Sequence, residues 1–200
     1  MDEKDKPLLI VISAPSGAGK STLCDRLLAA HPGIAYSVSC TTRAPRGGEV
    51  DGVHYHFLTP EAFEQKVQSG AFLEHAQVHG NRYGTLMQPL RQAMQQGKSN
   101  LMDIDVQGAR QVRAALASLP PTDLMVNGFV DIFIHPPSLE ELRRRLEGRG
   151  EDAAEVIERR MANAATELAD AGLYRYQLVN DELGRAQREL ADIIRKEQRA

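Results

Sequence analysis

The sequence LLIVISAPSGAGKST, residues 8–22, decides the fold that we expect for this chain. Its first six residues are apolar or small, which is typical of a fully buried strand. The glycine-rich run that follows leads directly into an apolar helical pattern. A strand, a glycine-rich loop and a helix N-terminus in this order are what a phosphate-binding loop requires. An ordinary strand–turn–helix containing Gly-Lys-Ser by chance is the alternative, and the context on both sides of the loop argues against it.

The residues of the loop suit the binding of a phosphate chain. Gly17 and Gly19 can adopt backbone angles closed to other residues, so that several N–H groups can point at one anion beside a helix N-terminus. Lys20 can reach a terminal phosphate, and the hydroxyl of Ser21 can bind Mg²⁺. Ala14 stands where the consensus has glycine, a mild departure because alanine is small. The expected phosphate-binding set is Ala14, Pro15, Ser16, Gly17, Ala18, Gly19, Lys20 and Ser21.

The composition is that of an ordinary globular protein, since 42% of the 200 residues are hydrophobic and 26% are charged. A formal net charge of −3 argues against bulk electrostatic binding to nucleic acid or an anionic membrane. No run of 18 apolar residues exists, and the charged N-terminus does not resemble a signal region. Cys24 and Cys40 suggest neither a disulfide framework nor a metal site. We therefore expect a cytoplasmic protein without nucleic-acid or membrane partners.

Buried strands alternate with helices along most of the chain, which predicts an α/β fold with a parallel-sheet core. The polar, hairpin-like stretch 40–85 breaks this alternation, so we expect it to form an inserted lobe. Within the lobe we expect a loop over 40–53. The other expected strands are 8–13, 34–38, 54–58, 71–78, 82–85, 100–106, 130–134 and 176–179. The expected helices are 21–30, 60–69, 86–96, 107–118, 139–147, 154–169 and 182–197.

Two acids stand near the end of the predicted strand 100–106, at Asp103 and Asp105. Ligands of open α/β sheets bind at the carboxyl ends of the strands, so Asp105 could hold Mg²⁺ directly or through water. The alternative is that Asp105 caps the helix that follows it.

Arginines gather around the predicted helices 139–147 and 154–169. Phosphoryl transfer needs positive charge around phosphate oxygens, and a guanidinium can hold two oxygens at once. The alternative is a solvated helix face with ion pairs such as Glu140–Arg144 and Glu141–Arg145. We favour this alternative for Arg143 and Arg144. For Arg149, which lies between the candidate hinge residues Gly148 and Gly150, we favour a mobile segment that clamps phosphate.

The expected lobe carries polar residues suited to a base and an anion, namely Ser39, Tyr55, Glu74, Tyr83 and Thr85. Tyrosine hydroxyls near Arg43 and Arg46 would complete an anion site. A carboxylate accepts two hydrogen bonds, and guanine offers two adjacent donors that adenine lacks. One buried glutamate at position 74 could therefore select guanine. The residues alone leave open that Glu74 is a solvent-facing strand residue.

Six segments, in order along residues 8–194, together resemble guanylate kinase. They are SAPSGAGKST (13–22), SVSCTTRAPRGGEVDGVHYHF (37–57), FLEHAQVHGNRYGT (72–85), LMDIDVQG (101–108), PPSLEELRRRLEGRG (136–150) and VNDEL (179–183). The phosphate loop alone is a broad signal. The block 37–49, joined to Glu74 and Tyr83-Gly84-Thr85, is specific to this family.

The resemblance implies a P-loop nucleoside monophosphate kinase that transfers the γ-phosphate of ATP to GMP with Mg²⁺. The core would comprise 1–39 and 86–200, with a GMP-binding lobe at 40–85 and a helical lid at about 138–165. Besides the loop, Arg145 and Asn180 would contact ATP. The implied GMP site is Ser39, Arg43, Arg46, Tyr55, Glu74, Tyr83, Thr85 and Asp105. The implied metal ligands are Ser21 and Asp105, and the implied catalytic residues are Lys20, Arg46, Arg149 and Arg160.

Two rival functions remain to be weighed. Scaffold domains of similar fold bind proteins without catalysis. The intact residues Lys20, Ser21, Asp105 and Arg149 argue against one here. A P-loop kinase of another phosphate ester, such as a sugar phosphate, is disfavoured by Glu74 together with Ser39 and Tyr83. The segment 120–131 matches nothing in the family pattern, so it could be a surface loop or a contact in a homo-oligomer.

Overall fold

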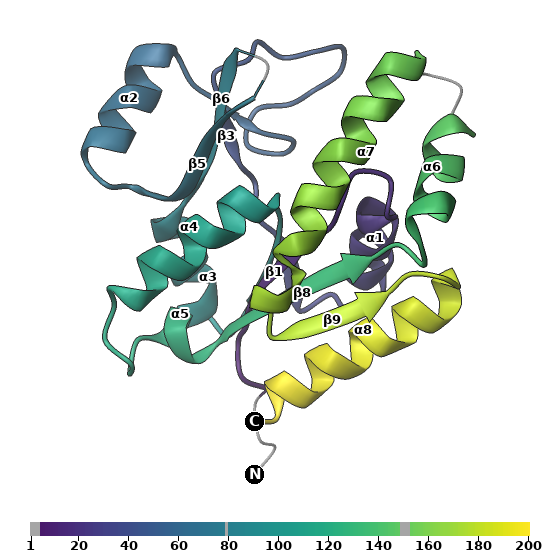
Figure 1. Ribbon diagram of the computed structural model, residues 1–200. Coiled ribbons are helices and arrows are strands. Elements are labelled where there is room, and N and C mark those ends of the chain that lie inside the picture. The colour runs from purple at the N-terminus through teal and green to yellow at the C-terminus, as the bar shows by residue number, and fades with distance from the viewer. Residues whose placement is uncertain (1–4, 79, 149–152) are drawn as a thin grey trace.

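A central parallel sheet organises the protein in the computed structural model, which describes residues 5–78, 80–148 and 153–200 (Figure 1). The sheet has five strands in the order β2-β7-β1-β8-β9, and every neighbouring pair is parallel. The predicted α/β fold with a parallel core is therefore confirmed. The strands are β1 (Leu9–Ser13), β2 (Ile34–Tyr36), β7 (Ser99–Asp103), β8 (Phe129–His135) and β9 (Tyr176–Val179).

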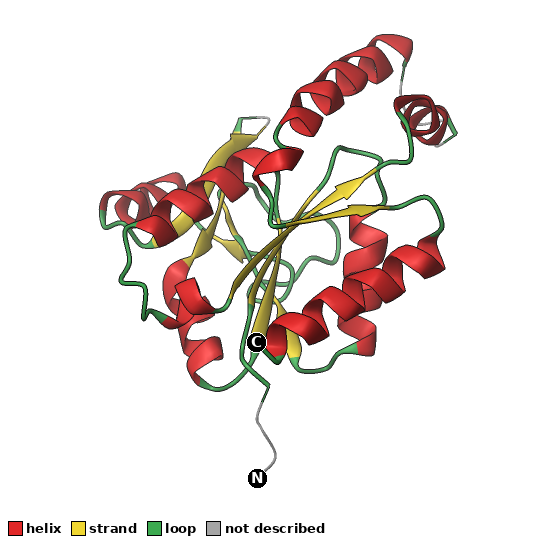
Figure 2. Ribbon diagram, turned by 60° about the horizontal axis from the view of Figure 1, so that its bottom comes forward, coloured by secondary structure: helices red, strands yellow, loops and turns green. Residues whose placement is uncertain are grey.

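Strand β1 is buried on both faces because its side chains alternate between two apolar cores. Leu8, Ile10 and Ile12 contribute to one core, and Leu9 and Val11 to the other. Helices cover both faces of the sheet (Figure 2). The first core is covered by α1 (Lys20–Ala30) and α8 (Leu183–Gln198), and the second by α3 (Met87–Gln95), α4 (Val106–Ala117) and α5 (Leu124–Asn127).

A second, smaller sheet stands at the upper left of Figure 1, within the predicted lobe. Its order is β4-β3-β6-β5, and its own core contains Cys40, Phe63 and Phe72. Thr59 caps the helix of this unit, since its hydroxyl accepts the N–H of Ala62 at 3.2 Å. The elements are β3 (Cys40–Thr41), β4 (His56–Phe57), α2 (Pro60–Gln68), β5 (Phe72–Val78) and β6 (Asn81–Leu86).

Helices α6 (Leu139–Glu147) and α7 (Ala154–Ala169) lie beside each other at the upper right of Figure 1. They share a small apolar core formed by Leu142, Leu146, Ile157 and Ala164. A 3₁₀ turn, η1 (Ala171–Leu173), then leads to β9. Gly148 ends α6 with φ of −65°, an angle open to any residue, so the structure does not use the freedom of glycine there. Arg149 and Gly150 lie outside the described residues.

Several predicted boundaries are wrong, each for a local reason. The predicted loop 40–53 begins with β3, two residues that pair with β4 and β6. The predicted strand 100–106 ends at Asp103, because the chain leaves the sheet to form the cap of α4. The segment 120–131 holds the short helix α5, because the side chain of Asp123 caps it by accepting the N–H of Met125 at 2.9 Å. Among the described residues, no helix combines the length and apolarity that crossing a membrane requires.

Candidate active site

The phosphate loop lies between β1 and α1, and both of its glycines are required. Gly17 has φ of 95° and Gly19 has φ of 90°, angles that other residues rarely adopt. A Cβ on Gly19 would lie 2.3 Å from Nδ2 of Asn180, and one on Gly17 would lie 2.9 Å from Cδ2 of Leu146. Backbone angle and close approach thus disfavour larger residues at both positions.

Asn180 and Arg145, both predicted near ATP, support this loop from the side of α6 and β9. Asn180 is 5% exposed and donates from Nδ2 to the carbonyl of Ala18 at 2.7 Å. Arg145 donates from Nη2 to the Asn180 carbonyl at 3.0 Å and from Nε to Glu141 at 2.9 Å. The two predicted nucleotide contacts therefore form one hydrogen-bonded chain that ends on the phosphate loop.

Lys20 forms an ion pair with an acid of the neighbouring strand. Its Nζ lies 2.5 Å from Oδ1 of Asp103 and donates to the carbonyl of Ile104 at 3.0 Å. The parallel pairing of β1 with β7 aligns Ile12 with Asp103, which places the acid directly beside the loop. The functional role was predicted for Asp105, whereas the partner of the lysine is Asp103.

A cavity of about 320 Å³ opens over the phosphate loop. Besides the loop it is lined by Ser21, Thr22, Asp105 and Glu167. Glu167, which was not among the predicted site residues, comes from α7 and lines this cavity beside the loop. Burial, followed by the charge of Asp105, raises the pKa of Glu167. Several glutamates lie along α7, and no local sequence signal singles out this one.

Asp105 caps α4, as the alternative interpretation of this residue held. Its Oδ1 accepts the N–H of Gly108 at 2.8 Å. The same side chain also lines the phosphate-loop cavity and a second cavity next to it. Asp105 can cap the helix and line both cavities at the same time, because the capping hydrogen bond fixes the position of its carboxylate.

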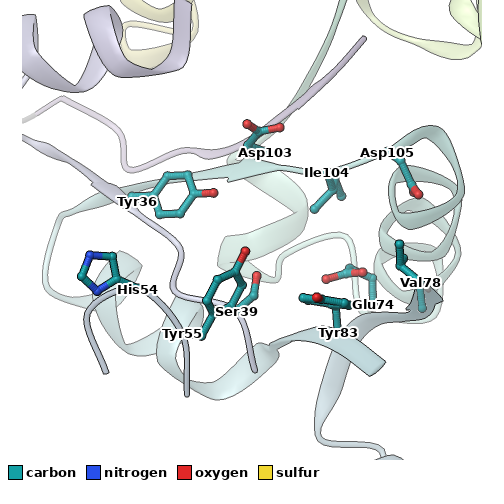
Figure 3. Close-up of a pocket in the computed structure, with 12 residues that line it drawn as sticks. Tyr36, Ser39, His54, Tyr55, Glu74, Val78, Tyr83, Asp103, Ile104 and Asp105 are labelled. Atoms are coloured by element: carbon teal, nitrogen blue, oxygen red, sulfur yellow. The ribbon is translucent and has the colours of Figure 1, made fainter. Parts of the chain in front are cut away.

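The second cavity, of about 230 Å³, lies between the smaller sheet and the carboxyl end of the central sheet (Figure 3). Four of the predicted base- and anion-binding residues line it: Ser39, Tyr55, Glu74 and Tyr83. Figure 3 shows their side chains gathered on one side of the cavity, opposite residues from β2, β7 and the start of α4. These opposing residues are Tyr36, Asp103, Ile104 and Asp105.

Glu74 is a buried carboxyl group inside this cavity, which excludes the solvent-facing alternative. It is 7% exposed, and Thr85 donates from Oγ1 to its Oε1 at 2.7 Å. Oγ of Ser39 lies 3.4 Å from the same Thr85 hydroxyl. Burial raises the pKa of Glu74, and the hydrogen bond from Thr85 opposes that rise. Thr85 itself does not line the cavity, so its contact is with Glu74.

One side chain of the predicted anion site, Arg43, pairs with an acid, Glu49, that was not among the predicted site residues. Arg43 donates to Glu49 from Nη1 at 3.0 Å and from Nη2 at 2.8 Å, and its guanidinium lies 5.4 Å from the ring centre of Tyr55. This pairing with Arg43 lowers the pKa of Glu49 to about 2. Arg46 is exposed, and its backbone N–H donates to Glu49 at 2.7 Å. Neither arginine lines the described cavity.

The arginines of α6 and α7 differ in their partners and their exposure. Arg143 pairs with Glu158 at 2.6 Å and Arg144 with Glu141 at 2.7 Å, which fits the solvated helix face favoured for both. The predicted Glu140–Arg144 pair is wrong, because Glu141 binds both Arg144 and Arg145. Arg160 lies half-buried on α7.

These two adjoining cavities, one over a phosphate loop and one holding a buried carboxyl group, define a P-loop phosphotransferase. Comparison with known proteins is more specific, because the guanylate kinase family model matches residues 6–197. The chain belongs to the guanylate kinase family, as its sequence resemblance predicted.

Individual relatives agree with this assignment. A guanylate kinase of Syntrophotalea carbinolica is 49% identical over 191 residues, which cover 96% of this chain and 86% of that protein. The crystal structure of guanylate kinase from Anaplasma phagocytophilum aligns with a TM-score of 0.70 and 35% identity, covering 98% of this chain and 88% of the other. A gluconokinase from Sinorhizobium meliloti 1021 aligns with a TM-score of 0.50 at 17% identity over 98% of this chain and 96% of its own, a likeness of fold alone.

Proposed function

We propose that this chain transfers the γ-phosphate of ATP to the phosphate of GMP, giving ADP and GDP. The observation that carries the proposal is the position of Glu74, a buried carboxyl group in a cavity that shares Asp105 with the phosphate-loop cavity. Two substrates bound in these cavities would bring their phosphates toward Asp105. Membership of the guanylate kinase family supports the same reaction.

ATP occupies the phosphate-loop cavity in this proposal. The loop N–H groups and the N-terminus of α1 bind its phosphates, with the chain from Asn180 to Arg145 holding the loop in shape. Lys20 contacts the terminal phosphates and must exchange its bond to Asp103 for them. Glu167 lines the same cavity, so its carboxyl group faces the space that the phosphates would occupy.

GMP occupies the second cavity, where the guanine faces Glu74. The ionised carboxylate accepts the two adjacent donors of guanine, and the Thr85 hydroxyl fixes its orientation. Adenine presents no such pair of donors, so it would leave the buried carboxylate unsatisfied. Ser39 completes the base site, while Tyr55, Tyr83, Arg43 and Arg46 bind the GMP phosphate at its other end.

The residues at the loop fit Mg²⁺. Mg²⁺ takes few protein oxygens and keeps water and substrate phosphates as its other ligands. The hydroxyl of Ser21 and the carboxylate of Asp105 line one cavity, and the described residues hold no cluster of three His, Cys, Asp or Glu that would bind a metal unaided. Ser21 and Asp105 would hold the ion, which supplies positive charge to the phosphates when bound.

Catalysis in this proposal rests on position and charge, and the protein forms no covalent bond. Lys20, Arg46, Arg149 and Arg160 surround the transferred phosphoryl group with positive charge, which compensates the charge on its oxygens. A phosphate oxygen of GMP attacks in line with the bond to ADP. The segments 40–85 and about 138–165 act as a lobe and a lid that close over the two substrates and exclude water. We also propose a cytoplasmic location, with ATP and GMP as the partners.

An ADP-release assay with GMP, AMP, UMP, dTMP and a sugar phosphate as acceptors tests the proposal. We expect turnover with GMP that exceeds the other four by orders of magnitude. Release of ADP with a sugar phosphate but not with GMP would assign the chain to another P-loop kinase. No ADP release with any acceptor, despite a folded protein, would favour a binding domain without catalysis.

A further inference from the structure

Strand β5, which carries Glu74, is hydrogen-bonded to helix α4 of the central domain by the side chain of Gln111. Gln111 has no role in the reaction proposed above. Strand β5 is an edge strand of the smaller sheet, so one side of its backbone has no strand partner. Gln111 of α4 meets this side at His75, the residue next to Glu74. Its Oε1 accepts the His75 N–H at 3.0 Å, and its Nε2 donates to the His75 carbonyl at 2.9 Å. The amide thus pairs with the edge as a neighbouring strand would.

A second contact of the same helix face touches the carboxyl group itself. Gly108 precedes Gln111 by three residues, so both lie on one face of α4. A Cβ at Gly108 would lie 3.3 Å from Oε2 of Glu74. The absence of a side chain there lets the carboxyl group approach the helix, whose first turn is capped by Asp105.

The apolar face of α4 packs in the central domain. Its apolar residues belong to the core beneath the parallel sheet, so the helix is a rigid support for whatever it holds. The pairing of β5 with β6 also shifts register between Phe72 and Glu74, an irregularity that re-aims side chains in a strand. The direction of Glu74 therefore depends on a local kink as well as on the support at His75. The apolar residues of α4 in this core are Val106, Ala109, Val112 and Leu116.

We propose that Gln111 is a positioning residue for base recognition. It fixes the backbone at His75, and through it the carboxylate of Glu74, relative to α4 and Asp105. The inference rests on the proposed function, since it assumes that Glu74 accepts the donors of guanine. Gln111 lines neither of the two substrate cavities, so we expect it to act on selectivity for the base and not on the phosphoryl transfer.

The test compares GMP with IMP, which lacks the 2-amino group that Glu74 is proposed to bind. In Gln111→Met, which keeps the length of the side chain but removes both hydrogen bonds, we expect KM for GMP to rise about tenfold, the scale of one hydrogen bond to a charged group. KM for ATP and kcat should stay within about twofold, and the preference for GMP over IMP should fall. Gln92→Met on α3 is the matched control, because Gln92 is exposed. It should change none of these values.

A second variant covers the case in which Gln111→Met does not fold. Gln111→Glu retains an acceptor for the His75 N–H and loses the donor to the His75 carbonyl, so its KM for GMP should exceed that of the parent by severalfold but by less than about tenfold, and its preference for GMP over IMP should fall. If the hydrogen bonds of Gln111 only stabilise the fold, either variant should have a lower melting temperature and the same preference for GMP over IMP as the parent. That result would overturn the inference.

Glu74→Gln separates failure of this inference from failure of the proposed function. If Glu74→Gln leaves the GMP-to-IMP preference unchanged, the proposed role of Glu74 is wrong and the role of Gln111 falls with it. If Glu74→Gln lowers the preference and Gln111→Met does not, the proposed function stands and only the inference is refuted. Where both lower it, Gln111→Met should have no further effect in the Glu74→Gln background, because it acts through Glu74.

Discussion

Gly19→Ala should damage the phosphate loop through two separate effects. A φ of 90° costs a residue with a Cβ about 1–2 kcal/mol. The new Cβ would lie 2.3 Å from Nδ2 of Asn180, so the amide must move and lose its bond to the Ala18 carbonyl, a loss of about 1–3 kcal/mol for a buried group. We expect the free energy of unfolding to fall by about 2–5 kcal/mol in total, which lowers Tm by roughly 4–20 °C for a chain of this size.

A matched glycine isolates the contribution of the contact. Gly97 has φ of 79° and its added Cβ would meet nothing within 4 Å, so Gly97→Ala should carry only the backbone cost. Thermal unfolding and the KM for ATP are measured for both variants. Gly97→Ala should leave KM for ATP unchanged, whereas Gly19→Ala should raise it severalfold because the loop loses its shape. Equal Tm and equal KM for the two variants would refute the reasoning.

Three further predictions concern the proposed substrate contacts. Glu74→Gln should raise KM for GMP by about 10- to 100-fold, the cost of one or two hydrogen bonds to a charged group, with KM for ATP nearly unchanged; equal losses for both substrates would remove Glu74 from base recognition. Because the pKa of Glu74 is raised, its carboxyl stays protonated to a higher pH than an ordinary glutamate, so KM for GMP should rise as the pH falls through that pKa. Glu74→Gln should abolish this part of the pH profile, and a profile identical in the parent and the variant would contradict the assignment. Arg149→Ala should lower kcat far more than it weakens GMP binding, as measured by steady-state kinetics and equilibrium titration; an unchanged kcat would exclude Arg149 from catalysis.

The features that the sequence predicted correctly are those with strong local signals. Strand β1 and helix α1 follow from an apolar run, glycines that need positive φ, and an apolar helical pattern. The start of α2 follows from Thr59 and Pro60, whose capping chemistry involves only neighbours in the chain. Family membership followed from the order and spacing of several such segments, and the comparisons confirm it.

What the sequence did not reveal depends on residues far apart in the chain. Strand β3 has only two residues and exists because β4 and β6 lie on either side of it. The partner of Lys20 is Asp103 because β7 lies beside β1 and ends there, a boundary that the local pattern placed three residues too late. Glu167 reaches the loop through the packing of α7, which a helical pattern alone does not determine.

The ion pair between Lys20 and Asp103 has a consequence for nucleotide affinity. The carboxylate of Asp103 already neutralises the lysine before a nucleotide phosphate binds. A phosphate that binds Lys20 must displace this carboxylate, and the carboxylate can pair with the lysine again when the phosphate leaves. This intramolecular competition lowers the affinity for both ATP and ADP, and a lower affinity for ADP favours fast product release before the next turnover.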